Sequence, residues 1–338
     1  MSVRIGINGL GRIGRTLFRL VSTAPDIQVA GINDVASPEI LAHLLLNDSV
    51  AGRWSVPVEG RESSIVASGR VIPCSRHAAP DAIPWGDWGV EIVVEATGLF
   101  RQRAAAARHL QSGVRQVIIS APSPDADRTI VWGINQTDLD PTQHRIVSAA
   151  SCTTQCAAPL IRIADEAWGV EACSMTTIHC YTNGQPLMDA PQGDLRRSRA
   201  AGMSMIPTST SASKALQEIF PDLASRISCL AVRVPTPFVS AVDLVVALKR
   251  ETDLERARER LRTAQDGSWQ GIVGYTEEDL VSVDFRGDSR SAIVDGHLLA
   301  LPSPRLLKIY AWYDNESGYS HRLLDLIRHL ASSAGDAR

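Results

Sequence analysis

Cys152 is the residue of this chain whose type and setting best suit covalent chemistry. It lies among the polar residues Ser151, Thr153 and Thr154, just ahead of a helix-like run over residues 157–167. The start of a helix lowers the pKa of a thiol and presents backbone N–H groups that can hold an oxyanion. We therefore expect Cys152 to be a nucleophile.

A thiol nucleophile needs a base, and His179 is the candidate. It follows a β-like run, residues 174–178, in the same half of the chain. A Cys–His couple can activate a thiol and then carry protons through the reaction. The other cysteines have neither paired nor zinc-type spacing, so we interpret them as free thiols and predict no metal site. Cys180, beside His179, is interpreted as an inert small residue.

A glycine pattern near the amino terminus predicts a dinucleotide site. Gly9, Gly11 and Gly14 follow an apolar strand, residues 3–8, and open a helix. In that context the backbone can approach a pyrophosphate at the positive end of the helix. Asp34 comes twenty residues after Gly14, where its carboxylate can accept both ribose hydroxyls and repel a 2′-phosphate. The pattern favours NAD over NADP.

The elements that must position these residues alternate strand and helix in the first half. Strands are expected at 3–8, 27–32, 90–95 and 117–120, and helices at 15–22 and in the Ala-rich stretch 102–112. This alternation predicts an α/β fold with a Rossmann-type, doubly wound parallel sheet. We interpret residues 56–73 as short β segments divided by Gly60 and Gly69, an excursion from that sheet.

The second half changes character from about Met175. Longer β-rich runs lie at 229–233, 240–249, 280–284 and 307–313. They predict an α+β catalytic domain with a largely antiparallel sheet, and apolar spacing over 319–332 predicts a closing helix. We expect an NAD-binding domain at 1–150, completed by the carboxy-terminal helix 316–338. The catalytic domain should then occupy 151–315.

Composition narrows the function classes. The 338 residues are 44% hydrophobic and 21% charged, which is typical of two folded globular domains. A net charge of −3 argues against electrostatic capture of nucleic acid or an anionic membrane. No apolar run has the length of a membrane-spanning helix, and the amino terminus lacks the pattern of a signal peptide. We expect a cytoplasmic protein.

Six segments, in order and spacing, resemble the signature segments of glyceraldehyde-3-phosphate dehydrogenases: INGLGRIGR, SAASCTTQCAAPL, TTIHCYTN, DLRRSRAAGMSMIPTST, VRVPTPFVSAVDLVV and WYDNESGY. The resemblance implies that Cys152 attacks the aldehyde and that His179 is its base. A hydride would pass from the thiohemiacetal to NAD, and inorganic phosphate would cleave the resulting thioester.

The resemblance also implies binding residues. Asn315 would fix the nicotinamide carboxamide, and the other implied cofactor contacts are Arg12, Ile13, Arg76, Thr97 and Ser120. The substrate's own phosphate would be held by Thr182 and Arg233. The attacking phosphate would be held at or beside Ser151, Thr153, Arg197, Thr210 and Ser211. An S-shaped loop near 181–205 resembles one that packs across a subunit interface, which implies a homotetramer.

Several positions depart from the family pattern and leave alternatives open. They are Gln155, Gly184, Ser211 and Ser317. In addition, Ala190-Pro191 only half matches the Leu-Pro pair that is typical of strictly NAD-dependent family members, which leaves room for some NADP use. The segment 291–296 favours an erythrose-4-phosphate dehydrogenase, but Thr182 and residues 207–210 favour the three-carbon substrate. A specialised paralogue, either tolerant of thiol-directed inhibitors or using arsenate, is a further alternative. A non-catalytic binding protein is disfavoured, because it would not need the Cys–His pair.

Overall fold

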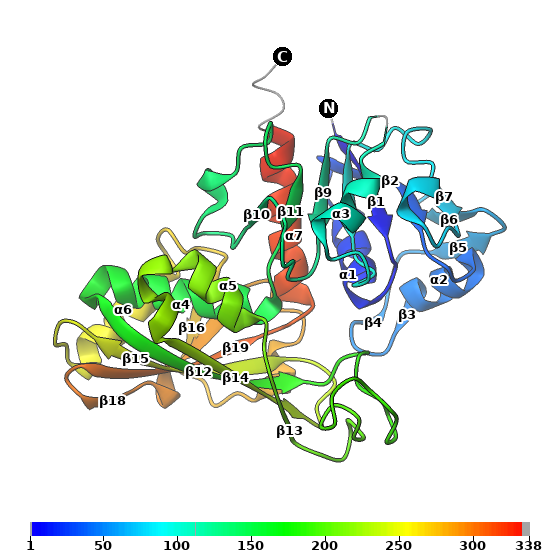
Figure 1. Cartoon of the computed structure of the whole chain (residues 1–338). Helices are drawn as coiled ribbons and strands as arrows, with labels where there is room; N and C mark the ends of the chain where they lie inside the picture. Colours follow the sequence, from blue (N-terminus) through cyan, green and yellow to red (C-terminus); the bar gives the residue numbers. More distant parts are fainter. Residues whose placement is uncertain (1, 112, 333–338) are drawn as a thin grey trace. The chain divides into compact units, whose positions relative to one another are not determined.

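The chain forms two compact units in the computed structural model, which describes residues 2–111 and 113–332 (Figure 1). The first unit is Met1–Ala150 with Ser320–Arg338, and the second is Ser151–Tyr319. Ser112, the last residue of the expected Ala-rich helix, and residues 333–338 of the expected closing helix lie outside the described residues.

One large sheet supports the first unit. Its strands are β1 (Val3–Asn8), β2 (Ile27–Asn33), β5 (Val58–Arg61), β6 (Ser64–Ala67), β7 (Arg70–Ser75), β8 (Ile92–Glu95), β9 (Gln116–Ile119), β10 (Arg128–Thr129) and β11 (Ile146–Ser148). Over the described residues their order is β10-β11-β9-β8-β1-β2-β7-β6-β5. All neighbours from β10 to β7 pair in parallel. The predicted Rossmann-type sheet is confirmed.

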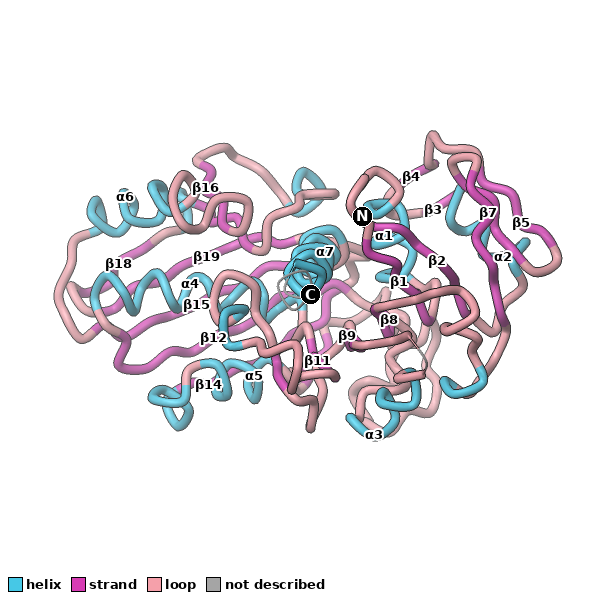
Figure 2. Tube along the Cα trace, turned by 90° about the horizontal axis from the view of Figure 1, so that it is seen from above, coloured by secondary structure: helices cyan, strands magenta, loops and turns pink. Residues whose placement is uncertain are grey.

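Helices lie on both faces of this sheet. Helix α1 (Arg12–Val21) joins β1 to β2, and α3 (Arg103–Ala106) lies between β8 and β9. These connections lead away from β1 in opposite directions, so right-handed crossovers place the two helices on opposite faces, as Figure 2 shows. Helix α2 (Pro38–Leu46) packs on β5, and the short strands β3 (Asn47–Asp48) and β4 (Gly52–Arg53) pair with each other.

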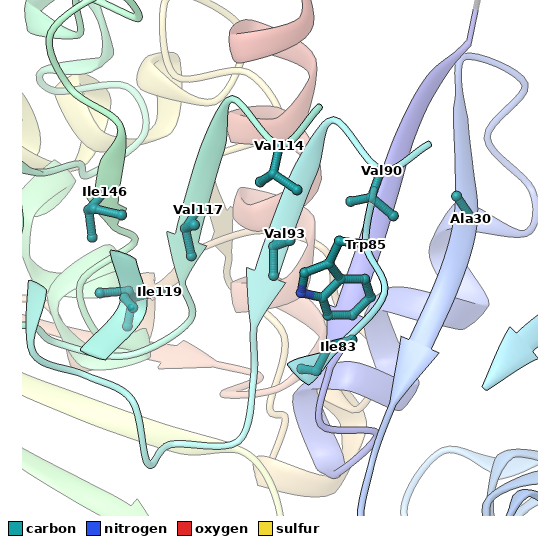
Figure 3. Packing of buried hydrophobic residues seen from close by; sticks show 10 residues of the cluster. Ala30, Ile83, Trp85, Val90, Val93, Val114, Val117, Ile119 and Ile146 are labelled. Atoms are coloured by element: carbon teal, nitrogen blue, oxygen red, sulfur yellow. The ribbon is translucent and has the colours of Figure 1, made fainter. Parts of the chain in front are cut away.

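The core of the first unit explains the apolar runs of its strands. Trp85, Val93 and Val117 are fully buried and belong to one cluster (Figure 3). Parallel strands covered on both faces need apolar side chains in both directions, which produces continuous runs rather than alternation. The long helix α7 (Ser317–Ser332) belongs to this unit from Ser320 onward, and its Arg328 pairs with Asp26 at 2.7 Å.

Two predictions for the first unit need correction. The short β segments expected over 56–73 are present as β5, β6 and β7, with Gly69 between β6 and β7. They do not leave the sheet, however, because β7 pairs in parallel with β2, and β6 and β5 extend the sheet through antiparallel pairs. Gly60 lies inside β5, where a Cβ would come within 2.5 Å of the backbone of Glu39; it permits close packing rather than ending a strand. The Ala-rich stretch forms only α3 and a 3₁₀ turn, Ala107–His109, because His109 is drawn into the core.

The second unit is built on a mixed sheet. Its strands are β12 (Val170–Cys180), β13 (Ile206–Thr208), β14 (Ile227–Val234), β15 (Ser240–Leu248), β16 (Val273–Thr276), β17 (Ala292–Asp295), β18 (Ala300–Ser303) and β19 (Leu306–Tyr313). The order is β13-β14-β12-β15-β19-β17-β16, with β18 beside β19. Pairs β12–β14 and β16–β17 are parallel and the others antiparallel. Helices α4 (Cys152–Trp168), α5 (Ala212–Ile219) and α6 (Leu254–Ala264) lie along one face (Figure 1).

The strand expected at 280–284 is also wrong, because the chain there forms a 3₁₀ turn, Ser282–Phe285. The Asp284 carboxylate accepts the backbone N–H of Val281 at 2.8 Å and closes the turn. Phe285 is buried and stacks on Trp312 with ring centroids 5.4 Å apart. Over the residues that the structure describes, no helix combines the length and the apolar character needed to cross a bilayer.

Candidate active site

The candidate nucleophile stands at the first position of α4. Ser151 is the N-cap, and its hydroxyl accepts the backbone N–H of Thr154 at 3.1 Å. Ala150, immediately before the cap, has a φ of 55°, a conformation that non-glycine residues adopt at a cost. This turn sets Cys152 at the helix start, where the backbone N–H groups of Cys152 and Thr153 hydrogen-bond its sulfur.

The structure brings Cys152 and His179 together. The Cys152 Sγ lies 3.5 Å from the His179 Nε2, and His179 stands near the end of β12 with 5% of its surface exposed. Burial raises the pKa of the Cys152 thiol, whereas the charge of Arg233 and hydrogen bonds at the helix start act in the opposite direction. The thiol and imidazole are therefore in position for direct proton transfer.

Arg233 approaches the other side of the imidazole. It lies on β14, paired in register with His179 on β12. Its Nη1 is 2.5 Å from the His179 Nδ1 and donates to the Cys180 carbonyl oxygen at 2.9 Å. Burial and the charge of Arg233 lower the pKa of His179 to about 3. The ring is therefore neutral at physiological pH.

Tyr313 supports this pair, and the sequence reasoning missed it. Its hydroxyl lies 2.9 Å from the Thr153 Oγ1 and 2.9 Å from the Thr177 Oγ1. Its ring packs edge-on against His179 with centroids 6.0 Å apart. The Thr153 side chain, expected near a phosphate, is thus hydrogen-bonded inside the unit. The signal for Tyr313 was its place in the WYDNESGY segment.

Three of the expected phosphate residues, Arg197, Thr210 and Ser211, lie at or beside the start of α5. The Arg197 Nε donates to the Thr208 Oγ1 at 2.6 Å, and its Nη2 donates to the Ser209 carbonyl at 3.1 Å. Thr210 follows directly, and Ser211 is the exposed N-cap of α5. The structure therefore holds the Arg197 guanidinium beside the segment that carries Thr210 and Ser211.

Asn315 and Thr182 both lie close to the carboxyl end of β12. The Asn315 side chain is 8% exposed, and its Oδ1 accepts the Cys180 S–H at 3.1 Å. Thr182 lies two residues beyond Cys180, with its backbone N–H donating to the Gln185 Oε1 at 3.3 Å. The strand that carries His179 therefore positions both residues: Thr182 follows it in the chain, and Asn315 is hydrogen-bonded to its last residue.

The glycine turn of the first unit has the shape that a dinucleotide needs. Gly9 has a φ of +93°, and a Cβ there would lie 2.8 Å from the Thr97 nitrogen. A Cβ on Gly14 would lie 2.1 Å from the Gly9 carbonyl oxygen. Gly11, the N-cap of α1, has open space around its Cβ position. These residues fit a pyrophosphate approaching the start of α1.

The other expected cofactor residues lie at the carboxyl edge of the parallel sheet, where such folds bind nucleotides. Asp34 accepts the Leu10 N–H at 2.8 Å, which ties the carboxylate to the glycine turn. The side chain of Arg12 pairs with the Asp48 carboxylate at 2.5 Å. Ile13 lies in α1, and Ser120 directly follows β9. Arg76 directly follows β7, and its guanidinium donates to the Val35 carbonyl oxygen.

A buried carboxylate beneath this edge was not foreseen. Glu95 is 1% exposed and accepts hydrogen bonds from the Thr97 N–H at 2.8 Å, the Thr97 hydroxyl, the Asn8 Nδ2 at 2.5 Å and the His109 Nε2 at 3.0 Å. The Trp85 indole donates to the His109 Nδ1 at 3.0 Å. Because Nδ1 accepts, the proton of the neutral ring is on Nε2 and points at Glu95.

Comparison with known proteins agrees with this geometry. Residues 3–103 match the family described as "Glyceraldehyde 3-phosphate dehydrogenase, NAD binding domain", and residues 151–315 match its "C-terminal domain". The chain belongs to the glyceraldehyde 3-phosphate dehydrogenase family. NAD is the cofactor of this family's amino-terminal domain, which the first unit contains.

Three curated relatives illustrate the extent of the family match. The chain is 45% identical over 332 residues to the glyceraldehyde-3-phosphate dehydrogenase of Geobacillus stearothermophilus, with 98% of this chain and 99% of the relative covered. It is 44% identical over 331 residues to glyceraldehyde-3-phosphate dehydrogenase 1 of Bacillus subtilis, with the same coverage. It is 42% identical over 334 residues to glyceraldehyde-3-phosphate dehydrogenase 2 of Streptomyces arenae, covering 98% and 100%.

The positions that depart from the glyceraldehyde 3-phosphate dehydrogenase pattern fall into two groups. Gln155 is buried in α4, three residues beyond Cys152. The other group lies in more open settings and comprises Gly184, Ser211 and Ser317. A Cβ on Gly184 would come no closer than 4.0 Å to a neighbour. The Ser317 hydroxyl donates to the Gly287 carbonyl oxygen at 3.0 Å. Within the described residues, no group of three or more His, Cys, Asp and Glu side chains could hold a metal ion.

Proposed function

We propose that this chain catalyses the NAD-dependent oxidative phosphorylation of D-glyceraldehyde 3-phosphate to 1,3-bisphosphoglycerate. The observation that carries the proposal is the contact of 3.5 Å between the Cys152 Sγ and the His179 Nε2 at the start of α4. Relatives across nearly the whole chain bear the name of this activity. The first unit is the NAD-binding domain and the second is the catalytic domain.

The covalent steps follow from this arrangement. The Cys152 thiol gives its proton to His179, and the sulfur forms a bond to the aldehyde carbon. Backbone N–H groups at the start of α4 hydrogen-bond the resulting oxyanion. Bound NAD supplies the acceptor for the hydride that leaves the thiohemiacetal carbon. Inorganic phosphate then attacks the thioester, which forms the acyl phosphate and releases the Cys152 thiolate.

Arg233 links substrate binding to the state of the base. For Nε2 to accept the thiol proton, the His179 Nδ1 must carry the hydrogen and donate to the Cys180 carbonyl, 2.7 Å away. Arg233 only donates hydrogen bonds, so its contact with the same Nδ1 favours the opposite tautomer. A substrate phosphate that draws Arg233 away would favour Nδ1–H and raise the pKa of His179. Substrate binding would thus prepare its own base.

The binding roles follow the same proposal. Asp34 accepts the adenosine ribose hydroxyls, and Asn315 holds the nicotinamide carboxamide. Cofactor contacts are completed by Gly9, Gly11, Arg12, Ile13, Gly14, Arg76, Thr97 and Ser120. Thr182 and Arg233 hold the substrate phosphate, and the attacking phosphate is held by Ser151, Thr153, Arg197, Thr210 and Ser211. The Thr153 hydroxyl is hydrogen-bonded to the Tyr313 hydroxyl in this structure.

We infer a cytoplasmic homotetramer that uses the loop 181–205 as part of its interface. Long apolar side chains of that loop are exposed in the single chain: Leu187 at 82%, Met188 at 73%, Leu195 at 91%, Met203 at 80% and Met205 at 74%. Several exposed apolar side chains within one loop are typical of a surface that another chain covers. Sedimentation equilibrium would give the mass of four chains, and a monomer at micromolar concentration would contradict the assembly.

The decisive assay compares aldehydes and acyl acceptors. NAD reduction is measured with glyceraldehyde 3-phosphate and with erythrose 4-phosphate, each with and without inorganic phosphate, and with arsenate in its place. The proposal predicts preferred, phosphate-dependent turnover of the three-carbon substrate and none by Cys152→Ser. Phosphate-independent turnover of erythrose 4-phosphate as the preferred reaction would overturn it.

A further inference from the structure

We propose that Cys180 is a positioning residue that orients the Asn315 carboxamide for NAD. The inference rests on the proposed role of Asn315 in binding the nicotinamide amide. It assigns a function to a thiol that the sequence analysis interpreted as an inert small residue. Cys180, which directly follows the proposed base, then takes part in cofactor recognition.

The hydrogen bond between the two side chains defines the direction of the amide. The Cys180 S–H donates to the Asn315 Oδ1 at 3.1 Å. Among the residues that the structure describes, this thiol is the one hydrogen-bond partner of the Asn315 side chain, which is 8% exposed. A carboxamide has an acceptor end and a donor end. Because the thiol holds the oxygen, the NH₂ group points away from it and remains available to an acceptor such as a carboxamide oxygen.

Cys180 is itself a fixed point. It is the last residue of β12 and fully buried. Its backbone N–H donates to the Ser240 Oγ at 3.1 Å, and its carbonyl oxygen accepts from Arg233 at 2.9 Å and faces the His179 Nδ1 at 2.7 Å. One residue thus contacts the proposed base, the proposed phosphate-binding arginine and the proposed nicotinamide-binding amide.

The thiol keeps its proton under assay conditions. Burial raises the pKa of Cys180 to about 12, so the S–H remains a donor at neutral and moderately alkaline pH. A thiolate would instead repel the Asn315 oxygen and reverse the amide. Cys152 differs in position, because it stands at the start of α4 with its sulfur 3.5 Å from the His179 Nε2.

The test measures NAD affinity in the full chain, by titration of protein fluorescence without aldehyde. Cys180→Ala removes the donor, Cys180→Ser restores one, and Cys173→Ala is the matched control, a buried thiol on the same strand. Loss of one net hydrogen bond predicts about 2- to 10-fold weaker NAD binding for Cys180→Ala. The serine variant should bind within about twofold of the parent, and Cys173→Ala should bind as the parent does. Equal NAD affinity of the two alanine variants would overturn the inference.

A double-mutant cycle separates positioning from general packing. In an Asn315→Ala background, Cys180→Ala should cause no further loss of NAD affinity, because the group that the thiol orients is gone. An additive loss would show that Cys180 acts on the fold rather than through Asn315. Since NAD binding is read without substrate, a chain that binds NAD in this pattern but fails to oxidise glyceraldehyde 3-phosphate would refute the proposed function and leave this inference standing.

Discussion

Replacing Glu95 by Gln tests whether the buried carboxylate supports the cofactor edge of the first unit. Each Glu95 oxygen faces two donors, the N–H and hydroxyl of Thr97 on one side and Asn8 with His109 on the other. A Gln must turn its NH₂ group toward one of these pairs. His109 cannot become the acceptor at Nε2, because Trp85 donates to its Nδ1.

The expected cost of Glu95→Gln follows from these contacts. At least one buried donor loses its acceptor, at about 1–3 kcal/mol, and the remaining bonds lose the strength that a charged acceptor gives. We expect the free energy of unfolding to fall by about 3 kcal/mol. For a unit of this size that corresponds to a fall in Tm of roughly 6–12 °C. NAD affinity should fall as well, because Thr97 packs against Gly9 in the glycine turn.

Differential scanning calorimetry with a matched control measures this effect. Glu91→Gln is the control, since Glu91 has a half-exposed side chain that accepts the Arg4 N–H at 3.0 Å. We expect that variant to melt within about 2 °C of the parent. If Glu95→Gln melted and bound NAD like Glu91→Gln, the reasoning from buried hydrogen bonds would be refuted.

Three further predictions concern the base, the substrate and the cofactor. Arg233→Gln should raise the KM for glyceraldehyde 3-phosphate about 10- to 100-fold, the cost of one charge-assisted contact. It should also shift the pH profile of Cys152 alkylation upward, because the Arg233 charge that lowers the pKa of Cys152 is removed; an unchanged KM and profile would contradict this. Asp34→Ser should raise kcat/KM with NADP relative to NAD by at least about tenfold, and steady-state kinetics with each cofactor would show it. The pKa of His179 is lowered from 6.5 to about 3, so below pH 6.5 the unfolded chain binds a proton that the folded chain does not, and stability present above pH 6.5 is lost as the pH falls toward 3. In urea unfolding, the free energy of unfolding of His179→Asn should therefore fall less steeply with acid than that of the parent; the same pH dependence in both proteins would disprove the shift.

The parallel half of the fold could be predicted because its signals are local. The run 3–8, the three glycines and Asp34 specify strand, turn and helix within one stretch of chain, and the structure has β1, α1 and β2 there. The stretch 102–112 failed because Ala favours helix locally, whereas the burial of His109 against Trp85 and Glu95 is a tertiary effect. Residues 280–284 failed for the same reason, since the stacking of Phe285 is invisible in the chain.

The candidate site could be predicted in its residues but only partly in its contacts. Cys152 and His179 carry recognisable chemistry, and their types suggested a couple before any distance was known. Tyr313 and Glu95 were missed because each has a partner that is far away along the chain, and a lone Tyr or Glu has no pattern of its own. The bond from Cys180 to Asn315 depends on side-chain direction at the end of β12, which no spacing of residues reveals.

A single-turnover experiment tests the central claim most directly. The chain is mixed with excess NAD and glyceraldehyde 3-phosphate without inorganic phosphate, and NADH and intact mass are followed together. The account predicts a burst of about one NADH for each active chain, with the phosphoglyceroyl group attached at Cys152 and released when phosphate is added. Sustained turnover without phosphate, or an acyl group on another cysteine, would contradict it.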